Sequence, residues 1–164
     1  MKSNYLEFEN QFRGDREKIL DRLSIYEPLI ELVIKDINSP KLIDVGCGRG
    51  EWLQKWKDRI DYCYGIDSNK NMVKACRENN LQVFEGDAID KLSELENGTV
   101  TVITIFHVIE HLENKKLLRL IKECQRILSD DGILIFETPS IDSLLVSTKS
   151  FHLDPTHINP INVD

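Results

Sequence analysis

The amino-acid sequence predicts an α/β fold with a doubly wound, mostly parallel sheet, and three observations lead to this prediction. First, short apolar runs of strand length recur between residues 42 and 136, and amphipathic stretches separate them. Second, these runs are apolar on nearly every residue, as in strands that are buried on both faces. Third, the first run passes directly into Gly46, Gly48 and Gly50, the kind of turn that links a strand to a helix in nucleotide-binding α/β proteins.

Residues 1–39 are expected to form a helical N-terminal extension. Apolar residues recur there at helical spacing between Ile19 and Ile37. Pro28 either breaks this pattern or opens a second helix at its first turn. Pro40 marks the end of the segment.

Residues 40–139 form the predicted α/β core. Its expected strands are residues 42–45, 62–66, 82–84, 100–106 and 133–136. Its expected helices are residues 51–58, a helix capped by Ser68 that closes at Asn79-Asn80, residues 89–95, and residues 114–128, which a turn at residues 129–132 ends. Right-handed crossovers put helices on both faces of such a sheet, and ligands bind at the carboxyl ends of its strands. Residues 140–164 show no strand pattern and are expected to form a long, partly mobile loop.

Composition narrows the classes of function. The 164 residues suffice for one domain with a substantial core. A net charge of −7 argues against an extended nucleic-acid surface. The sequence shows neither a signal peptide nor an apolar run near the roughly 20 residues of a transmembrane segment. The cysteines form no paired motif, so we expect reduced thiols and a cytoplasmic location.

The glycine turn indicates a nucleoside ligand without a pyrophosphate. A dinucleotide fingerprint needs a third glycine where this chain has Glu51, whose charge would repel phosphate. A P-loop is excluded because no Gly-Lys-Ser/Thr follows. Asp44 precedes the glycines instead, and a carboxylate suits a ligand that carries ammonium and hydroxyl groups. S-adenosylmethionine is such a ligand, and a glycine turn of no function is the alternative.

Polar residues also follow the other strands, where parallel sheets place their ligand contacts. Asp67 follows the second strand and can accept both ribose hydroxyls, although an NAD site would need the same acid. Asp87 follows the third strand and can accept from an adenine amino group, with ordinary helix capping as the alternative. Phe106-His107 ends the fourth strand. With the glycine turn, these residues resemble the class I S-adenosylmethionine-dependent methyltransferases, whose fold is Rossmann-like.

The resemblance extends over residues 41–139, and the stretch from Phe106 to Leu112 is especially typical of small-molecule branches of that family. It implies S-adenosylmethionine as cofactor and S-adenosylhomocysteine as product. The cofactor-binding residues that it implies in this core are Asp44, Gly46, Cys47, Gly48, Asp67, Ser68, Met72, Asp87, Ala88, Phe106 and His107. Met72 is alternatively a residue of the hydrophobic core.

A narrower resemblance rests on the segments at residues 12–16, 46–53, 137–139 and 151–157, which read FRGDR, GCGRGEWL, ETP and FHLDPTH. Together they are similar to the methyltransferase domain of O-antigen chain-terminating enzymes. In that family an arginine of the first motif holds the cofactor carboxylate, so Arg13 or Arg16 is the expected contact, with a solvated surface arginine as the alternative. Known members modify the end of a surface polysaccharide, so the resemblance alone implies polysaccharide biosynthesis and a glycan acceptor.

His107, Glu110 and His111 are the predicted catalytic cluster. Their spacing of i, i+3 and i+4 would place all three on one face of a helix start. Two imidazoles and a carboxylate can bind a divalent metal. Some O-methyltransferases have a similar Glu-x-x-Glu-His block with bound metal, but here His107 takes the first position. The alternative is that Glu110 and His111 orient the loop while His107 faces the cofactor.

The loop after the fifth strand supplies further candidates. His152, Asp154 or His157 could complete a metal site with the cluster. An alcohol acceptor needs a base or a metal to lower its pKa. His111 or His107 is the candidate base, and His157 is the next candidate.

The sequence thus predicts transfer of a methyl group to an oxygen atom of a glycan, a phospho-glycan or a small molecule, with residues 140–164 near the acceptor. The alternative is a non-catalytic module that binds the cofactor as a sensor or partner-binding domain, whereas Glu51 disfavours a nicotinamide oxidoreductase. The family fold normally continues with a helix and two more strands. We therefore expect the tail, a missing C-terminal segment or a second subunit to cover the edge of the fifth strand.

Overall fold

The computed structural model describes residues 15–162, which form a five-stranded parallel sheet in the order β3-β2-β1-β4-β5. The strands are β1 (Lys41–Val45), β2 (Tyr62–Asp67), β3 (Val83–Glu85), β4 (Val100–Phe106) and β5 (Leu128–Glu137). The chain proceeds outward from β1 to β3 and then crosses to β4 on the other side of β1. The carboxyl ends of β1 and β4 therefore flank the point where the strand order reverses, which is where such sheets bind ligands. The predicted doubly wound sheet is confirmed.

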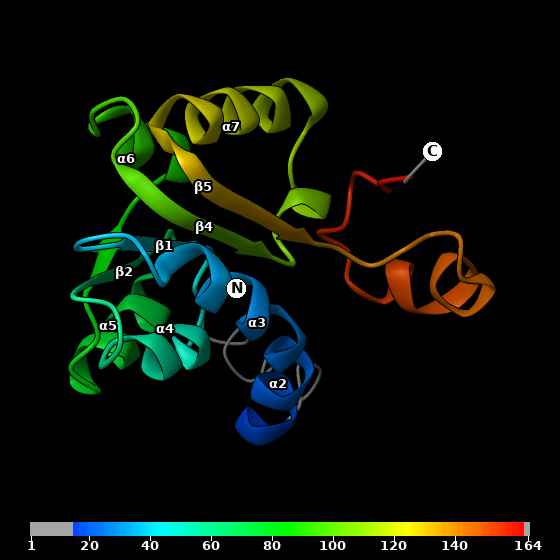
Figure 1. Ribbon diagram of the computed structural model, residues 1–164. Helices are drawn as coiled ribbons and strands as arrows, with labels where there is room; N and C mark the ends of the chain where they lie inside the picture. Colours follow the sequence, from blue (N-terminus) through cyan, green and yellow to red (C-terminus); the bar gives the residue numbers. More distant parts are fainter. Residues whose placement is uncertain (1–14, 163–164) are drawn as a thin grey trace.

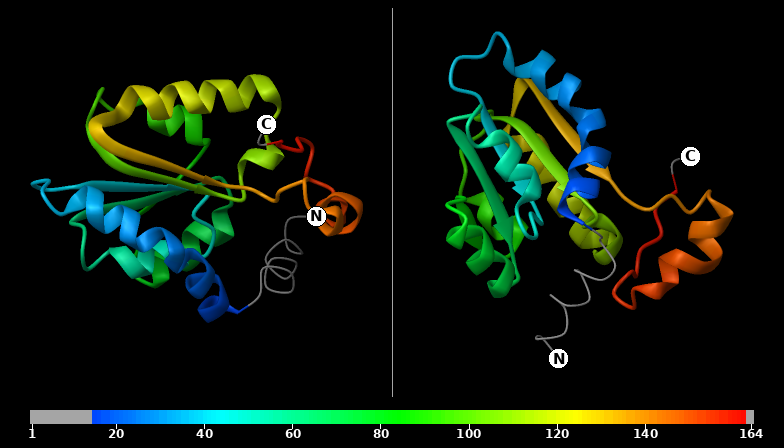
Figure 2. Two further views of the ribbon diagram at one scale, coloured as in Figure 1. Left: turned by 45° about the vertical axis from the view of Figure 1, so that its right-hand side comes forward. Right: turned by 90° about the horizontal axis from the view of Figure 1, so that it is seen from below.

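Helices cover both faces of this sheet (Figures 1 and 2). One face carries α2 (Arg16–Leu23), the 3-10 turn η1 (Ser24–Tyr26), α3 (Glu27–Ile34), α4 (Glu51–Trp56) and α5 (Lys70–Glu78), and the other carries α6 (Ala88–Ser93) and α7 (Asn114–Ile127). Trp52 and Trp56 of α4 are fully buried in the core of the first face, and Leu120 and Cys124 of α7 in that of the second. All seven residues of β4 are buried, which explains its unbroken apolar sequence.

The residues that begin and end individual helices were harder to predict than the order of strands and helices. Pro28 lies in the first turn of α3, so it opens a helix rather than breaking one. The prediction that Ser68 caps α5 is wrong. The cap is Asn69, whose side chain accepts a hydrogen bond from the backbone N–H of Asn71 at 3.0 Å. Ser, Asp and Asn are all good caps, so the sequence alone could not separate these adjacent residues.

The predicted turn at residues 129–132 is also wrong, because these residues belong to β5. The strand starts at Leu128, directly after α7, and Leu128 pairs with Val100. The next pair joins Ile133 to Val102, so the ladder shifts register and the residues between form an irregular, bulge-like segment. Turns and bulges contain the same residue types, so the sequence could not show that Gly132 belongs to a bulge-like segment of a strand.

The segment after β5 contains more structure than the predicted loop. It holds a π-helical turn, η3 (Val146–Ser150), followed by a 3-10 turn, η4 (Phe151–Leu153). In Figure 1 these turns form an arm, coloured orange, that extends away from the sheet. The chain then returns, and the N–H groups of Ile158 and Asn159 both donate to the carbonyl of Glu110. The arm is therefore anchored beside the carboxyl end of β4.

Two further observations concern the surface of residues 15–162. None of the helices in this part of the chain is both long and apolar enough to cross a membrane. In the same residues no strand pairs with the outer edge of β5. What covers that edge stays a prediction.

Candidate active site

A cavity of about 390 Å³ opens at the carboxyl ends of the strands. Its volume lies within the roughly 300–1,000 Å³ of small-molecule sites. The predicted cofactor residues that line it are Gly46, Gly48, Asp67, Ser68, Met72, Asp87, Ala88 and His107. Met72 is also 1% exposed, so its two interpretations are compatible.

The glycine turn after β1 has backbone conformations that favour glycine. Gly46 has φ +70° and Gly48 has φ +55°. A Cβ atom on Gly46 would also overlap the side chain of Val108, which lines the same cavity. Glycine is therefore required at position 46 both for the turn and for the space beside it.

Asp67 holds this glycine turn in place. Its Oδ2 atom accepts from the N–H of Gly48 at 2.9 Å, and its Oδ1 atom accepts from the N–H of Asn69 at 2.7 Å. The N–H of Gly46 donates to the carbonyl of Ile66 at 2.8 Å, which fixes the turn against β2 a second time. The carboxylate thus faces the cavity with its position set by two backbone groups.

Asp87 caps a helix and also lines the cavity. Its Oδ1 atom caps α6 by accepting from the N–H of Ile89 at 2.9 Å, and the residue lines the cavity. Lys116 of α7 approaches Oδ2 to 2.7 Å and also lines the cavity. Burial alone would raise the pKa of Asp87, but Lys116 and the capping N–H outweigh burial and lower it.

Asp44, Cys47 and Phe106 surround a second, smaller cavity of about 30 Å³, which shares Gly46 and His107 with the first. Asp44 is 3% exposed and accepts from the hydroxyl of Thr104 at 2.7 Å. The Cys47 thiol stays protonated, because a hydrogen bond with Cys76 and burial raise its pKa.

The smaller cavity also identifies an arginine that sequence reasoning missed. Arg22 lines it, six residues further along α2 than Arg16, the last residue of the motif that carried the expectation. Of the two predicted arginines, Arg16 lies 3.9 Å from Glu51, which lines the same cavity. Arg13 lies outside the described residues.

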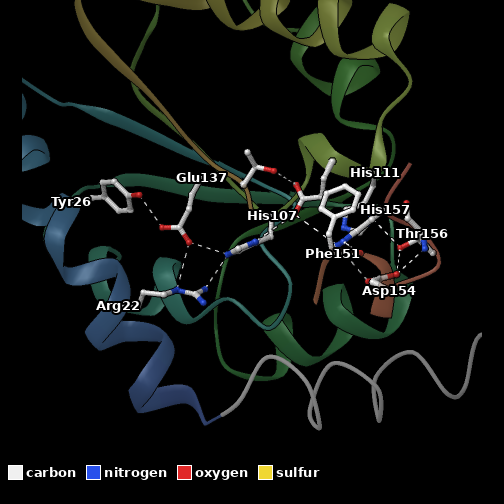
Figure 3. A network of polar contacts seen from close by, with 11 residues as sticks. Arg22, Tyr26, His107, His111, Glu137, Phe151, Asp154, Thr156 and His157 are labelled. Atoms are coloured by element: carbon white, nitrogen blue, oxygen red, sulfur yellow. Dashed lines mark hydrogen bonds and ion pairs between the residues drawn. The ribbon is translucent and has the colours of Figure 1, made fainter. Parts of the chain in front are cut away.

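A polar network joins Arg22 to the ends of β4 and β5 (Figure 3). The Nε2 atom of His107 lies 2.9 Å from Oε1 of Glu137 and 3.2 Å from Nη2 of Arg22. The Nε atom of Arg22 is 3.5 Å from the same Glu137 oxygen. The Tyr26 hydroxyl donates to the other Glu137 oxygen at 2.8 Å. The network therefore ties the N-terminal helices to the site.

The charges in this network are set by its contacts. Burial alone would lower the pKa of His107, but Glu110 and Glu137 outweigh it and raise the pKa. Burial alone would raise the pKa of Glu137, but the contacts with His107 and Tyr26 outweigh burial and lower it. Burial and the Glu137 contact raise the pKa of Tyr26 to about 12. Both nitrogens of His107 thus face carboxylates, with Nδ1 at 3.4 Å from Glu110.

The prediction that one helix start presents His107, Glu110 and His111 together is wrong. His107 has φ +55°, and a 3-10 turn, η2 (Ile109–His111), begins only after Val108. The donors that do converge are Glu110, His111 and His157, which lie within 4.8 Å of one another. Figure 3 shows His111 and His157 side by side, with Asp154 and Thr156 beside them, and His107 turned toward Glu137.

The comparisons with known proteins agree with this geometry. A family model described as a methyltransferase domain matches residues 13–163. The structure is similar to an S-adenosylmethionine-dependent methyltransferase from Archaeoglobus fulgidus, with a TM-score of 0.86 and 34% identity over 97% of this chain and 68% of that one.

Two relatives of known name are more distant. A ubiquinone biosynthesis O-methyltransferase of Idiomarina loihiensis is 27% identical over 60% of this chain, which spans 42% of that protein. A tRNA (carboxymethyluridine(34)-5-O)-methyltransferase of Xenopus tropicalis is 28% identical over 67% of this chain and 17% of its own length. The chain thus spans less than half the length of these relatives.

Proposed function

The chain belongs to the methyltransferase domain family, and we propose that it binds S-adenosylmethionine in the larger cavity and transfers the methyl group to an oxygen atom. When bound, this cofactor supplies a methyl group on a positively charged sulfur. The new O–C bond forms as the S–C bond breaks, the electron pair stays on sulfur, and the acceptor proton leaves to a base. S-adenosylhomocysteine is the second product.

The observation that supports this proposal best is the clamp of Asp67 on the glycine turn. The same carboxylate that positions Gly48 faces the cavity, where a ribose diol offers two hydroxyl donors. Asp87 also lines this cavity, and an adenine amino group would donate to it. The two carboxylates and the glycine turn suit a nucleoside, and the negative charge of Glu51 directly after the turn disfavours a pyrophosphate.

Arg22 is our candidate for the cofactor carboxylate, in place of Arg13 or Arg16. Its guanidinium stands at the smaller cavity beside Asp44, whose carboxylate suits the ammonium of the same amino acid. An arginine matches a carboxylate with paired N–H donors. The cofactor would thus place its amino-acid end over the smaller cavity and its nucleoside in the larger one.

An oxygen acceptor is supported by the relatives, because the ubiquinone and tRNA enzymes are both named for transfer to oxygen. The acceptor would approach at the edge formed by His111 and Thr156, which line the larger cavity. His107 is poorly suited as a base, since both of its nitrogens face carboxylates. His111, with His157 and Glu110 behind it, is the better candidate to activate the acceptor. A glycan or phospho-glycan acceptor, a cytoplasmic location and an oligomeric state remain predictions.

A module that binds the cofactor without turnover is the second candidate, and the engagement of His107 by Glu137 favours it. Incubation of the full-length protein with methyl-labelled S-adenosylmethionine and a panel of glycans, phospho-glycans and phenols separates the two. We expect label on at least one oxygen acceptor. Binding of S-adenosylhomocysteine without transfer to any acceptor would favour the module, and preferential binding of NADH would exclude both.

A further inference from the structure

We propose that Glu110, His111 and His157 form a binding site for a divalent transition-metal ion such as Zn²⁺. The three residues come from two segments: the 3-10 turn after β4, and the stretch that returns after η4. One nitrogen of each imidazole and one carboxylate oxygen lie within 4.8 Å of one another. The ring centroids of His111 and His157 are 4.7 Å apart.

Each imidazole is oriented through its Nδ1 atom. The Nδ1 of His157 lies 2.8 Å from the carbonyl oxygen of Phe151, so this nitrogen carries the proton and donates. The Nδ1 of His111 lies 2.9 Å from the hydroxyl oxygen of Thr156, whose own proton goes to Asp154. Both rings therefore present Nε2 as the nitrogen with a lone pair. A metal-binding histidine is typically oriented in this way, by a hydrogen bond from its other nitrogen.

Glu110 provides the negative charge. Its side chain is 0% exposed, and its Oε2 atom accepts from the hydroxyl of Thr138 at 3.1 Å. Its Oε1 atom is buried and makes no hydrogen bond within the described residues; it lies 3.4 Å from Nδ1 of His107 and 4.0 Å from Nε2 of His157. A buried carboxylate oxygen without a donor at hydrogen-bond geometry is costly. A cation between this oxygen and the lone pair of His157 would satisfy both acceptors.

The ligand types favour a transition metal. Imidazole nitrogens suit Zn²⁺ and similar ions, whereas Mg²⁺ and Ca²⁺ prefer oxygen ligands. Zn–N bonds of roughly 2.0–2.1 Å in a tetrahedral site place ligand atoms about 3.3 Å apart. The cluster would close on the ion by about 1.5 Å, and three protein ligands would leave a position for a solvent or acceptor oxygen.

The position of the site suggests that the ion activates the methyl acceptor, a role that rests on the proposed function. His111 and Thr156 line the larger cavity on the side where the acceptor would enter. An ion at the open position would bind the acceptor hydroxyl and lower its pKa. His111 and His157 would then act as ligands rather than as proton acceptors.

The test is metal binding by the full-length protein, first freed of metal with a chelator and then titrated with Zn²⁺ or Co²⁺. We expect about one equivalent to bind, and Co²⁺ to show visible absorption bands of nitrogen and oxygen ligation. His111→Ala and His157→Ala should each weaken binding at least about tenfold. His152→Ala is the matched control, because this exposed histidine of the same segment lies outside the cluster.

The remaining outcomes are also decisive. Melting temperatures and the affinity for S-adenosylhomocysteine show whether each variant is folded, and Glu110→Gln gives a further test where they are retained. Failure of the wild type to bind an equivalent of either ion would overturn the site. A loss in His152→Ala equal to that in His157→Ala would do the same. Bound metal without methyl transfer would count against the proposed function and leave the metal site standing.

Discussion

Asp67→Asn tests the clamp on which the cofactor site depends. In the structure the carboxylate accepts from Gly48 at 2.9 Å and from Asn69 at 2.7 Å. Asparagine keeps one acceptor oxygen and replaces the other with an NH₂ group, which cannot accept. One backbone N–H then faces a donor, and one ribose hydroxyl loses its partner. A hydrogen bond to a charged group contributes about 1.5–3 kcal/mol, so the Kd for S-adenosylhomocysteine should rise about 10- to 160-fold.

Isothermal titration with S-adenosylhomocysteine measures this effect directly. Asp58→Asn is the matched control, because it makes the same chemical change at an exposed position just after α4. Its Kd should equal that of the wild type. Melting temperatures of both variants show whether a weaker Kd reflects the site or general unfolding.

An unchanged Kd in a folded Asp67→Asn protein would refute the assignment. The ribose would then bind elsewhere, and the carboxylate would only shape the glycine turn. An equal loss in Asp58→Asn would show that net charge, rather than the clamp, governs affinity.

Three further variants probe other parts of the site. Gly46→Ala should unfold at a lower urea concentration than Gly98→Ala. Both glycines have φ near +70° and share a backbone cost of roughly 1–2 kcal/mol, but a Cβ on Gly98 meets nothing within 4 Å, whereas one on Gly46 overlaps Val108. Equal urea midpoints for the two variants would contradict the crowding at Gly46. Arg22→Ala should weaken binding of S-adenosylhomocysteine but leave 5′-methylthioadenosine, which lacks the carboxylate, unaffected; equal losses for both ligands would exclude Arg22 as its partner. Tyr26 has a folded pKa of about 12 against an ordinary 10.0, so the stability it adds is present below pH 10.0 and is lost as the pH rises toward 12; the stability difference between wild type and Tyr26→Phe should shrink over that range, and a constant difference would show that Tyr26 does not titrate there.

The strands and the ligand edge of the sheet could be predicted because their signals are local. The strands are buried on both faces, so each reads as a short apolar run. Asp67 and Asp87 each follow a strand directly, and a parallel sheet brings the carboxyl ends of its strands together without any further information. The glycine turn could be predicted from the spacing of its glycines alone.

The contacts that complete the site could not be predicted, because they depend on how distant segments dock. Arg22 and His107 are 85 residues apart, and their contact exists only because α2 packs where it does. Lys116 reaches Asp87 from α7, and no spacing in the sequence joins these two residues. The left-handed backbone at His107 keeps it out of the helical turn that the i, i+3, i+4 pattern implied, so that it contacts Glu137 as well as Glu110.

Because of its left-handed backbone conformation, His107 contacts both the Arg22–Glu137 pair and the metal-ligand cluster. Its Nε2 atom meets Glu137 beside Arg22, while its Nδ1 atom points toward Glu110 of the metal-ligand cluster. Because the pKa of His107 is raised, the imidazole can carry a proton and balance the two carboxylates. A cofactor carboxylate that draws Arg22 away from Glu137 would leave the Oε1 atom of that glutamate to His107 and strengthen their pairing. The interaction of His107 with Glu110 would then weaken, which would leave Glu110 better able to hold a cation where the acceptor enters.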